Sequence, residues 1–180
     1  ATPVVRDIVR NLQDRVLKCG EKLEETPVQI NNKSYSLGAG GIHSKDSPGI
    51  YRSDEEYTIF YGDVSSFYPS IQTALKLYPR HFGPELLEIL SELKNKRLAA
   101  KKAQQTVKDA SLKTILVSYF GKFGSPYSPF YDLINMLRTT KNGQVYLLKL
   151  IEMLGQSNFE VLSANTDGLF IKALKKDEVQ

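Results

Sequence analysis

The sequence predicts an α+β fold, in which helices pack against an antiparallel sheet. Apolar residues recur at steps of three and four in several segments, a spacing typical of amphipathic helices. Short β-branched and aromatic runs lie outside these segments, and two of them flank the turn-forming sequence Asn165-Thr166-Asp167-Gly168. The chain has 180 residues, of which 41% are hydrophobic, and this is enough to bury the core of one compact domain.

Two helices are expected to pack against this sheet. The first spans residues 3–19, with Pro3 suited to its first position and Gly20 to its end. Its apolar face consists of Val5, Ile8, Val9, Leu12 and Val16. The second spans residues 143–154, with Gly155 as its C-cap.

A helical hairpin is expected over residues 84–121. Its first helix begins at Pro84, and its second helix follows a polar break at residues 104–108 and is halted by Gly121 and Gly124. The apolar positions of the two helices are Leu86, Leu87, Leu90, Leu93, Leu98, Leu112, Ile115, Leu116 and Tyr119.

Strands are expected in the remaining segments. Residues 58–61 form a β-branched and aromatic run that ends at Gly62 and Asp63. Residues 159–164 and 169–173 flank the hairpin turn. Turn-forming residues crowd the segment 31–50, which predicts a glycine-rich loop there.

Composition narrows the range of functions. A charged fraction of 24%, together with the lack of any apolar run near the roughly 20 residues of a membrane span, argues against disordered and membrane proteins. We therefore expect a soluble, cytoplasmic protein without a membrane partner. Its one cysteine, Cys19, and its two histidines, His43 and His81, are too few for a Cys/His zinc site, so a metal should be bound by oxygen. The net charge of +4 slightly favours a polyanionic partner.

Acidic residues stand at the ends of two predicted strands. Asp63 follows the aromatic strand, and Asp167 lies in the hairpin turn. On neighbouring strands two carboxylates repel each other unless a cation lies between them, and oxygen ligands suit Mg²⁺ or Mn²⁺. Such a pair fits two-metal phosphoryl or nucleotidyl transfer. Taken by itself, an Asp in such a turn is usually a turn former, so the surrounding motifs decide the interpretation.

Three segments resemble the polymerase motifs of family B DNA polymerases, in the family's order. Asp63 with residues 64–71 resembles the first motif, an Asp followed by Ser-Leu-Tyr-Pro-Ser-Ile. Lys113 with residues 118–124 resembles the second motif, and residues 163–168 resemble the third, Asp-Thr-Asp-Ser. The resemblance is strongest to the short phage and viral members. The sequence departs from the family at Val117, where the family has Asn, at Phe120 (Tyr), at Asn165 (Asp) and at Gly168 (Ser).

The resemblance implies a metal site and a catalytic pair. Asp63 and Asp167 would bind two Mg²⁺ ions, or Mn²⁺, with the backbone carbonyl of Val64 as a further ligand. In the family the second acid of the third motif is the essential ligand, and here that position holds Asp167, while Asn165 takes the less critical first position.

The resemblance also implies a nucleotide site. Backbone N–H groups of Ser66 and Phe67 would bind the triphosphate, because successive amides in a turn attract anions. The ring of Tyr68 would exclude a ribose 2′-OH as a steric gate, with a core tyrosine as the alternative. The implied cationic contacts to the triphosphate are Arg97, Lys101 and the catalytic Lys113.

Template contacts are implied in two places. Gly40 and Gly41 resemble a glycine-rich loop that approaches the template strand, with a plain β-turn as the alternative. Phe120 and Gly121 would lie beneath the nascent base pair.

Palm and fingers regions follow from the resemblance, which covers residues 36–173. Residues 1–82 and 125–180 would form the palm and residues 83–124 short fingers, and neither an exonuclease nor a thumb domain is expected in the chain. The implied reaction is template-directed transfer of dNTPs to a primer 3′-OH. The implied partners are primer-template DNA, dNTPs and the remaining polymerase domains, in a bacterial cytosol or in a phage- or virus-infected cell. The alternatives are a catalytically silent nucleic-acid-binding module, or another palm-fold nucleotidyltransferase such as a reverse transcriptase or primase.

Overall fold

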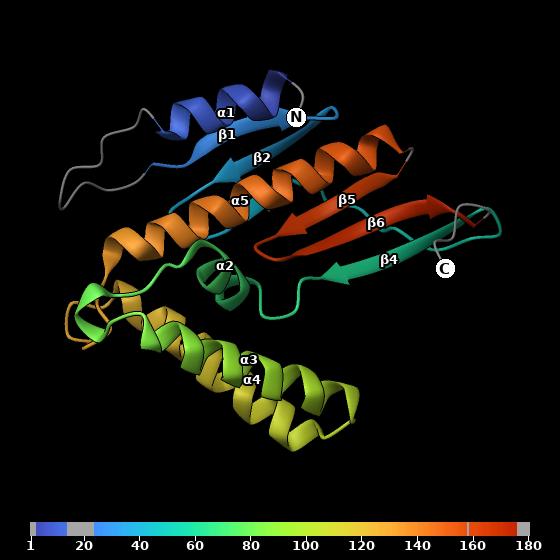
Figure 1. Cartoon of the computed structure of the whole chain (residues 1–180). Coiled ribbons are helices and arrows are strands. Elements are labelled where there is room, and N and C mark those ends of the chain that lie inside the picture. The colour runs from blue at the N-terminus through green and yellow to red at the C-terminus, as the bar shows by residue number, and fades with distance from the viewer. Residues whose placement is uncertain (1–2, 14–23, 158, 176–180) are drawn as a thin grey trace. The chain divides into compact units, whose positions relative to one another are not determined.

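The computed structural model describes residues 3–13, 24–157 and 159–175. Across these residues it contains five α-helices and a six-stranded antiparallel sheet, which confirms the predicted α+β class (Figure 1). The chain divides into two compact units. Unit 1 comprises Ala1–Val64 and Gly143–Gln180, and unit 2 comprises Ser65–Asn142.

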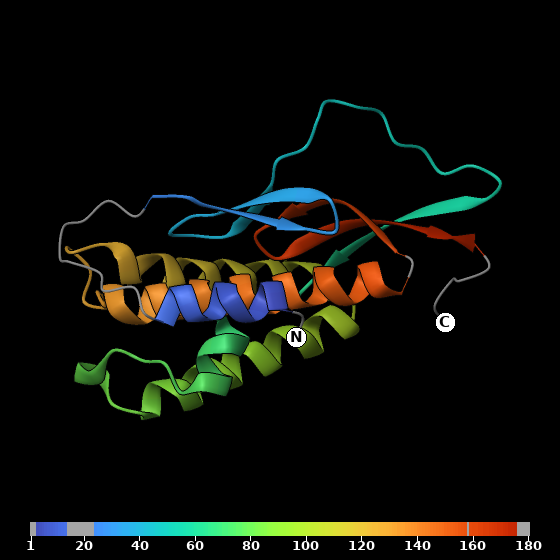
Figure 2. The same ribbon diagram turned by 90° about the horizontal axis from the view of Figure 1, so that it is seen from above.

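Unit 1 is built on the sheet, whose strands lie in the order β1-β2-β3-β5-β6-β4. The strands are β1 Thr26–Ile30, β2 Lys33–Leu37, β3 Ile42–Ser44, β4 Tyr57–Asp63, β5 Glu160–Asn165 and β6 Gly168–Leu174. Helix α1 (Pro3–Gln13) and the second half of helix α5 (Leu133–Gln156) lie on the same face of the sheet, as Figure 2 shows. The core of the unit includes Tyr35, Leu37, Ile42, Leu147, Leu148 and Ile151.

The segment 31–50 differs from the predicted loop, because it contains β2 and β3. Asn31 and Asn32 both have positive φ, 51° and 62°, and connect β1 to β2 as a two-residue turn. This backbone conformation matches the twist of a hairpin. The turn-forming residues at the start of the segment therefore mark a tight hairpin and not a long loop.

One of the two helices that were predicted to pack on the sheet differs from its predicted bounds. Helix α1 agrees with the prediction over the described residues, and residues 14–19 of the predicted helix lie outside them. Helix α5 begins at Leu133, upstream of the predicted start at residue 143, and it continues through Gly155, which is not its C-cap. The start is fixed by Asp132, whose Oδ1 accepts a hydrogen bond from the backbone N–H of Asn135 (2.9 Å), as in an N-cap.

Unit 2 contains the predicted helical hairpin. Helices α3 (Glu85–Lys102) and α4 (Thr106–Gly121) pack against each other, and α4 ends at the predicted glycine. The break between them is shorter than predicted. A short 3-10 helix at Arg80–Phe82 precedes the hairpin, and another at Lys122–Gly124 follows it.

Helix α2 (Phe67–Leu75) was not predicted. The sequence placed Ser66 and Phe67 in a turn, whereas Phe67 begins this helix and Ser66 is its N-cap residue, with φ of 56°. Within the described ranges, no helix has both the length and the apolar character needed to cross a membrane.

Candidate active site

The two predicted catalytic acids occupy neighbouring positions in unit 1. Asp63 is the last residue of β4 and pairs with Gly168, the first residue of β6. Asp167 directly precedes Gly168 in the two-residue turn between β5 and β6 (Figure 1). The backbone N–H of Val64 donates a hydrogen bond to the carbonyl of Asp167 (3.0 Å). Residues about a hundred positions apart in sequence are thus joined at one end of the sheet.

The glycine-rich segment braces this turn. The backbone N–H of Thr166 donates to the carbonyl of Ile42 (2.8 Å). A Cβ atom on Gly41 would lie 2.7 Å from Cα of Thr166, so no larger residue fits there without displacing the turn. A Cβ atom on Gly40 would meet nothing within 4 Å. Close packing against Thr166 therefore explains why position 41 is glycine, without any contact to DNA. It does not explain why position 40 is glycine.

Gln144 of α5 holds the same glycine-rich segment in place through hydrogen bonds to its backbone. Its Nε2 atom, on a side chain that is 1% exposed, lies 2.8 Å from the carbonyl oxygens of Gly38 and Gly40 and 3.0 Å from that of Gly41. Sequence reasoning did not identify Gln144. The only signal was a polar residue at an apolar position of the predicted helix.

Asn165 occupies the first acidic position of the third motif and lies beside the pair. It is exposed, it pairs with His43 of β3 and with Gly168 of β6, and its Oδ1 accepts a hydrogen bond from the Thr166 hydroxyl (3.1 Å). Asn165 therefore has a local hydrogen-bonding role in the turn.

The donor chemistry of this end of the sheet fits Mg²⁺. Asp63 and Asp167 offer carboxylate oxygens, and the adjacent backbone offers carbonyl oxygens. Mg²⁺ is typically bound through one or two carboxylates and keeps water or substrate phosphates as its other ligands. In the described part of the chain, no group of three or more His, Cys, Asp or Glu side chains is placed to hold a metal. An ion bound here would need water, backbone or substrate oxygens to complete its shell.

Unit 2 brings together three of the predicted nucleotide contacts. Arg97 of α3 donates from Nη1 to the hydroxyl of Ser66 (2.8 Å), and Lys101, one turn later, donates to the hydroxyl of Ser65 (3.0 Å). Ser66 makes no side-chain capping bond to the backbone of α2. Positive φ in a serine is uncommon and costs energy, so the surrounding contacts must hold it. The result is a cationic cluster at the start of α2, three residues after Asp63.

Asp109 of α4 orients the guanidinium in this cluster. Nε of Arg97 donates to Oδ1 of Asp109 (3.0 Å), and Arg97 is only 8% exposed. Sequence reasoning did not identify Asp109, although it stands four residues before Lys113 and so lies on the same face of α4. Lys113 is exposed, and no contact brings it to the other two cations within the described residues.

The two predicted aromatic contacts of the nucleotide and base pair touch each other. The ring centroids of Tyr68 and Phe120 are 4.4 Å apart, with an angle of 31° between the ring planes. Phe67 stacks on Tyr68 with centroids 5.6 Å apart. Gly121, the other residue predicted to lie beneath the base pair, is exposed, and a Cβ atom there would meet nothing within 4 Å.

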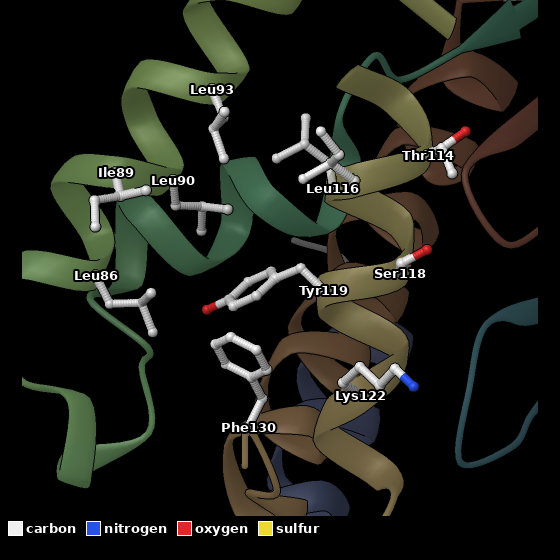
Figure 3. Close-up of a pocket in the computed structure, with 11 residues that line it drawn as sticks. Leu86, Ile89, Leu90, Leu93, Thr114, Leu116, Ser118, Tyr119, Lys122 and Phe130 are labelled. Atoms are coloured by element: carbon white, nitrogen blue, oxygen red, sulfur yellow. The ribbon is translucent and has the colours of Figure 1, made fainter. Parts of the chain in front are cut away.

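A separate cavity of about 460 Å³ lies between α3 and α4 (Figure 3). Its walls are apolar, and they include Leu86, Ile89, Leu90, Leu93, Leu116 and Phe130. None of the predicted nucleotide contacts lines it. The ring of Tyr119 points into it, and the Tyr119 hydroxyl is buried without a hydrogen-bond partner among the described residues. Burial, reinforced by the negative charge of Asp132, raises the pKa of this phenol, which therefore remains neutral over the physiological range.

Comparison with known proteins identifies the fold. The chain is similar to the family B DNA polymerase from the hyperthermophilic archaeon Pyrobaculum calidifontis, with a TM-score of 0.54 and 18% sequence identity, over 88% of this chain and 23% of that one. No family model matches the chain, and a sequence comparison with curated proteins gives no match either. The archaeal source of the neighbour gives no support to the phage or viral type. The chain thus has a family B polymerase-like fold and spans about a quarter of the length of that neighbour.

Proposed function

We propose that this chain carries the palm and fingers of a family B DNA polymerase and takes part in template-directed transfer of dNTPs to a primer 3′-OH. The proposal rests on one observation above all. The fold pairs Asp63 with the turn that holds Asp167, although about a hundred residues separate them. A hairpin turn that served only to connect β5 and β6 would not require an acidic residue such as Asp63 next to it.

The carboxylates would serve as ligands of Mg²⁺ or Mn²⁺. Asp63, Asp167 and the carbonyl of Val64 would hold the ions, which supply Lewis-acid activation of the primer hydroxyl and neutralise phosphate charge. The exposed position of Asp63 at the strand end leaves room for substrate oxygens. Residues 1–82 and 125–180 would form the palm.

The cationic cluster of unit 2 would bind the triphosphate. Lys101 and Arg97 converge on the serines that precede α2, and Asp109 holds the guanidinium in a fixed orientation. Fixed cations stabilise a loosely bonded phosphoryl transition state without reorganising during the reaction. Lys113 would join them when nucleotide binds. Residues 83–124 would form the fingers.

The Tyr68–Phe120 pair would form the sugar and base surface of the nucleotide site. The ring contact between them supports a rigid gate, since each ring limits the rotamers of the other. The remaining roles are those that the motif resemblance implies. The triphosphate would be bound by Ser66 and Phe67, the base pair would lie on Gly121, and the template strand would pass Gly40 and Gly41. The same proposal names primer-template DNA and the remaining polymerase domains as partners. It also includes a cytoplasmic location and a phage or viral origin.

A single-turnover extension assay tests this function. Primed template, dNTPs and Mg²⁺ or Mn²⁺ are supplied to the wild type, to Asp63→Ala and to Asp167→Ala. We expect either substitution to abolish extension while primer-template binding stays nearly unchanged, because it removes a metal ligand and no phosphate contact. Asn165→Ala is the matched control and should cost much less. Wild-type extension by Asp167→Ala would contradict the two-metal assignment.

Two departures from the family's motifs favour a second candidate, a catalytically silent nucleic-acid-binding module. Asn165 replaces an acid of the third motif and is engaged with Thr166, and Val117 replaces the Asn of the second motif. The same assay separates the two candidates, since a silent module would bind primed template and extend it with neither metal ion.

A further inference from the structure

Tyr61 covers the position where the third motif lacks a side chain. A Cβ atom on Gly168 would lie 2.5 Å from the Tyr61 hydroxyl oxygen and 2.9 Å from the ring carbon that bears it. The phenol of Tyr61 therefore occupies the space that the family's serine would fill at position 168. Any side chain at position 168 would require this phenol to move.

The Tyr61 side chain lies on the same face of β4 as that of Asp63. Gly168 pairs with Asp63 and Phe170 pairs with Tyr61, so the side chains of Tyr61 and Asp63 emerge on the same face of β4. They are two residues apart on one strand, which is about 6.6 Å along the backbone. Because the hydroxyl reaches over Gly168, the phenol leans toward the end of the strand where Asp63 stands.

The ring is held but not buried. Tyr61 is 60% exposed, and its ring packs on Phe170 with centroids 4.8 Å apart and an interplanar angle of 44°. Within the described residues its hydroxyl has no hydrogen-bond partner. An exposed aromatic ring with an unused hydroxyl, fixed beside a catalytic acid, offers both a packing face and a hydrogen-bond donor to a substrate.

We propose that Tyr61 binds the terminal nucleotide of the primer strand, with its hydroxyl donating to a sugar or phosphate oxygen and its ring packing against the sugar. This inference rests on the proposed function. The primer 3′-OH has to reach the metal site at Asp63 and Asp167, so the nucleotide that carries it passes over the neighbouring residue on the same face of the strand. The Tyr61 hydroxyl takes over the hydrogen-bonding capacity that a serine at position 168 would have.

The test relocates the hydroxyl from one strand to the other. Tyr61→Phe removes only the oxygen, and Tyr61→Ala removes the whole phenol. Tyr61→Ala/Gly168→Ser then supplies a hydroxyl from β6 at nearly the same place, and Tyr61→Ala/Gly168→Ala fills that space without a hydroxyl. Binding of a labelled primer-template with a recessed 3′ end is measured by fluorescence anisotropy in Ca²⁺, which needs no turnover. A blunt duplex of the same length is the control ligand.

We expect Tyr61→Phe to weaken binding of the recessed end about tenfold, as loss of a hydrogen bond to a charged group does, and to leave blunt-duplex binding unchanged. The serine double variant should recover most of the affinity that Tyr61→Ala loses, and the alanine double variant should not. Wild-type affinity in Tyr61→Phe would overturn the inference. Equal recovery by both double variants would also overturn it, because it would show that Tyr61 only fills space.

The Tyr61 binding experiment and the extension assay that tests the proposed function can fail independently of each other. Tyr61→Phe deletes one exposed atom, so the decision rests on a variant whose folding is not in question, and thermal melts verify the others. If Asp63→Ala abolishes extension while Tyr61→Phe binds normally, only the inference on Tyr61 fails. If the wild type extends no primer but Tyr61→Phe weakens binding of the recessed end, only the catalytic proposal fails.

Discussion

At the scale of single residues, the hydroxyl of Tyr119 is buried between α3 and α4 without a partner in the described part of the chain. Two phenylalanine rings pack against its ring edge to face, Phe123 with centroids 5.0 Å apart and Phe130 with 5.4 Å. An unsatisfied buried polar group costs stability, and its removal at constant shape is neutral or stabilising. We therefore expect Tyr119→Phe to maintain the free energy of unfolding or to raise it by up to about 1 kcal/mol.

The same residue predicts a loss of stability at alkaline pH. Because the folded-state pKa of Tyr119 is raised, its contribution is fully present below the ordinary tyrosine pKa near 10 and is lost as pH rises above that value. Tyr35, whose pKa burial raises to about 12, contributes in the same direction. Urea unfolding at pH 8 and above pH 10 should show a smaller alkaline loss in Tyr119→Phe than in the wild type. An equal loss in both proteins would mean that water reaches the Tyr119 hydroxyl.

At the scale of elements, the connection between the glycine-rich segment and the β5–β6 turn is open to a matched test. Gly41→Ala places a methyl group 2.7 Å from the backbone of Thr166, and the turn has to move or the segment has to leave the sheet. We expect a loss of about 1 to 3 kcal/mol in the free energy of unfolding, the usual cost of overpacking. Gly40→Ala, where the methyl group meets nothing within 4 Å, is the control and should change stability little.

Extension activity adds a second readout for this pair of glycine variants. Asp167 follows Thr166 directly, so a displaced turn should also impair nucleotide transfer in Gly41→Ala. If Gly40→Ala impaired transfer at normal stability instead, a template contact of Gly40 would explain it better than packing does. Equal stability of the two variants, measured by thermal melting, would contradict the close approach of Gly41 to the turn.

Elements with strong local signals were predictable, and those that depend on tertiary contacts were not. The β5–β6 hairpin follows from four turn residues between two apolar strands, and in the structure Asn165 pairs with Gly168, which leaves a two-residue turn. The start of α5 was not predicted, because it depends on Asp132, whose side chain accepts a hydrogen bond from Asn135 as an N-cap does. The early end assigned to that helix came from Gly155, which remains helical.

In the candidate site, too, residues with local signals were predicted and residues that act through distant contacts were not. The neighbouring positions of Asp63 and Asp167, and the shared helical face of Arg97 and Lys101, follow from strand ends and helical spacing. Asp109 and Gln144 were missed because each acts on a segment distant in sequence, and neither stands in a recognisable motif. Tyr61 was missed for a related reason, since its significance depends on the absent side chain of Gly168 on the next strand.

At the scale of the whole molecule, charge limits how the chain can bind a nucleic acid. The net charge is +4, and several cations are already engaged. Lys96 pairs with Glu92 at 2.6 Å, Arg97 with Asp109 at 3.0 Å, and Lys33 with Asp46 at 3.0 Å. With 20 Asp and Glu residues against 24 Lys and Arg residues, we expect the chain to neutralise few phosphates, and each neutralised phosphate adds about −0.9 to the slope of log affinity against log salt.

We therefore expect this chain to bind primed DNA weakly and with a shallow slope of about −3 to −4, measured by anisotropy between roughly 50 and 200 mM salt. Lys101→Ala should not change this slope if Lys101 binds the nucleotide triphosphate and not the duplex, and Lys102→Ala on the same helix provides the matched exposed control. A slope that became shallower by about one in Lys101→Ala would identify Lys101 as a contact to the DNA backbone. A much steeper wild-type slope would mean that a cationic surface outside the cluster of Arg97 and Lys101 binds the duplex, because two cations are too few to produce such a slope.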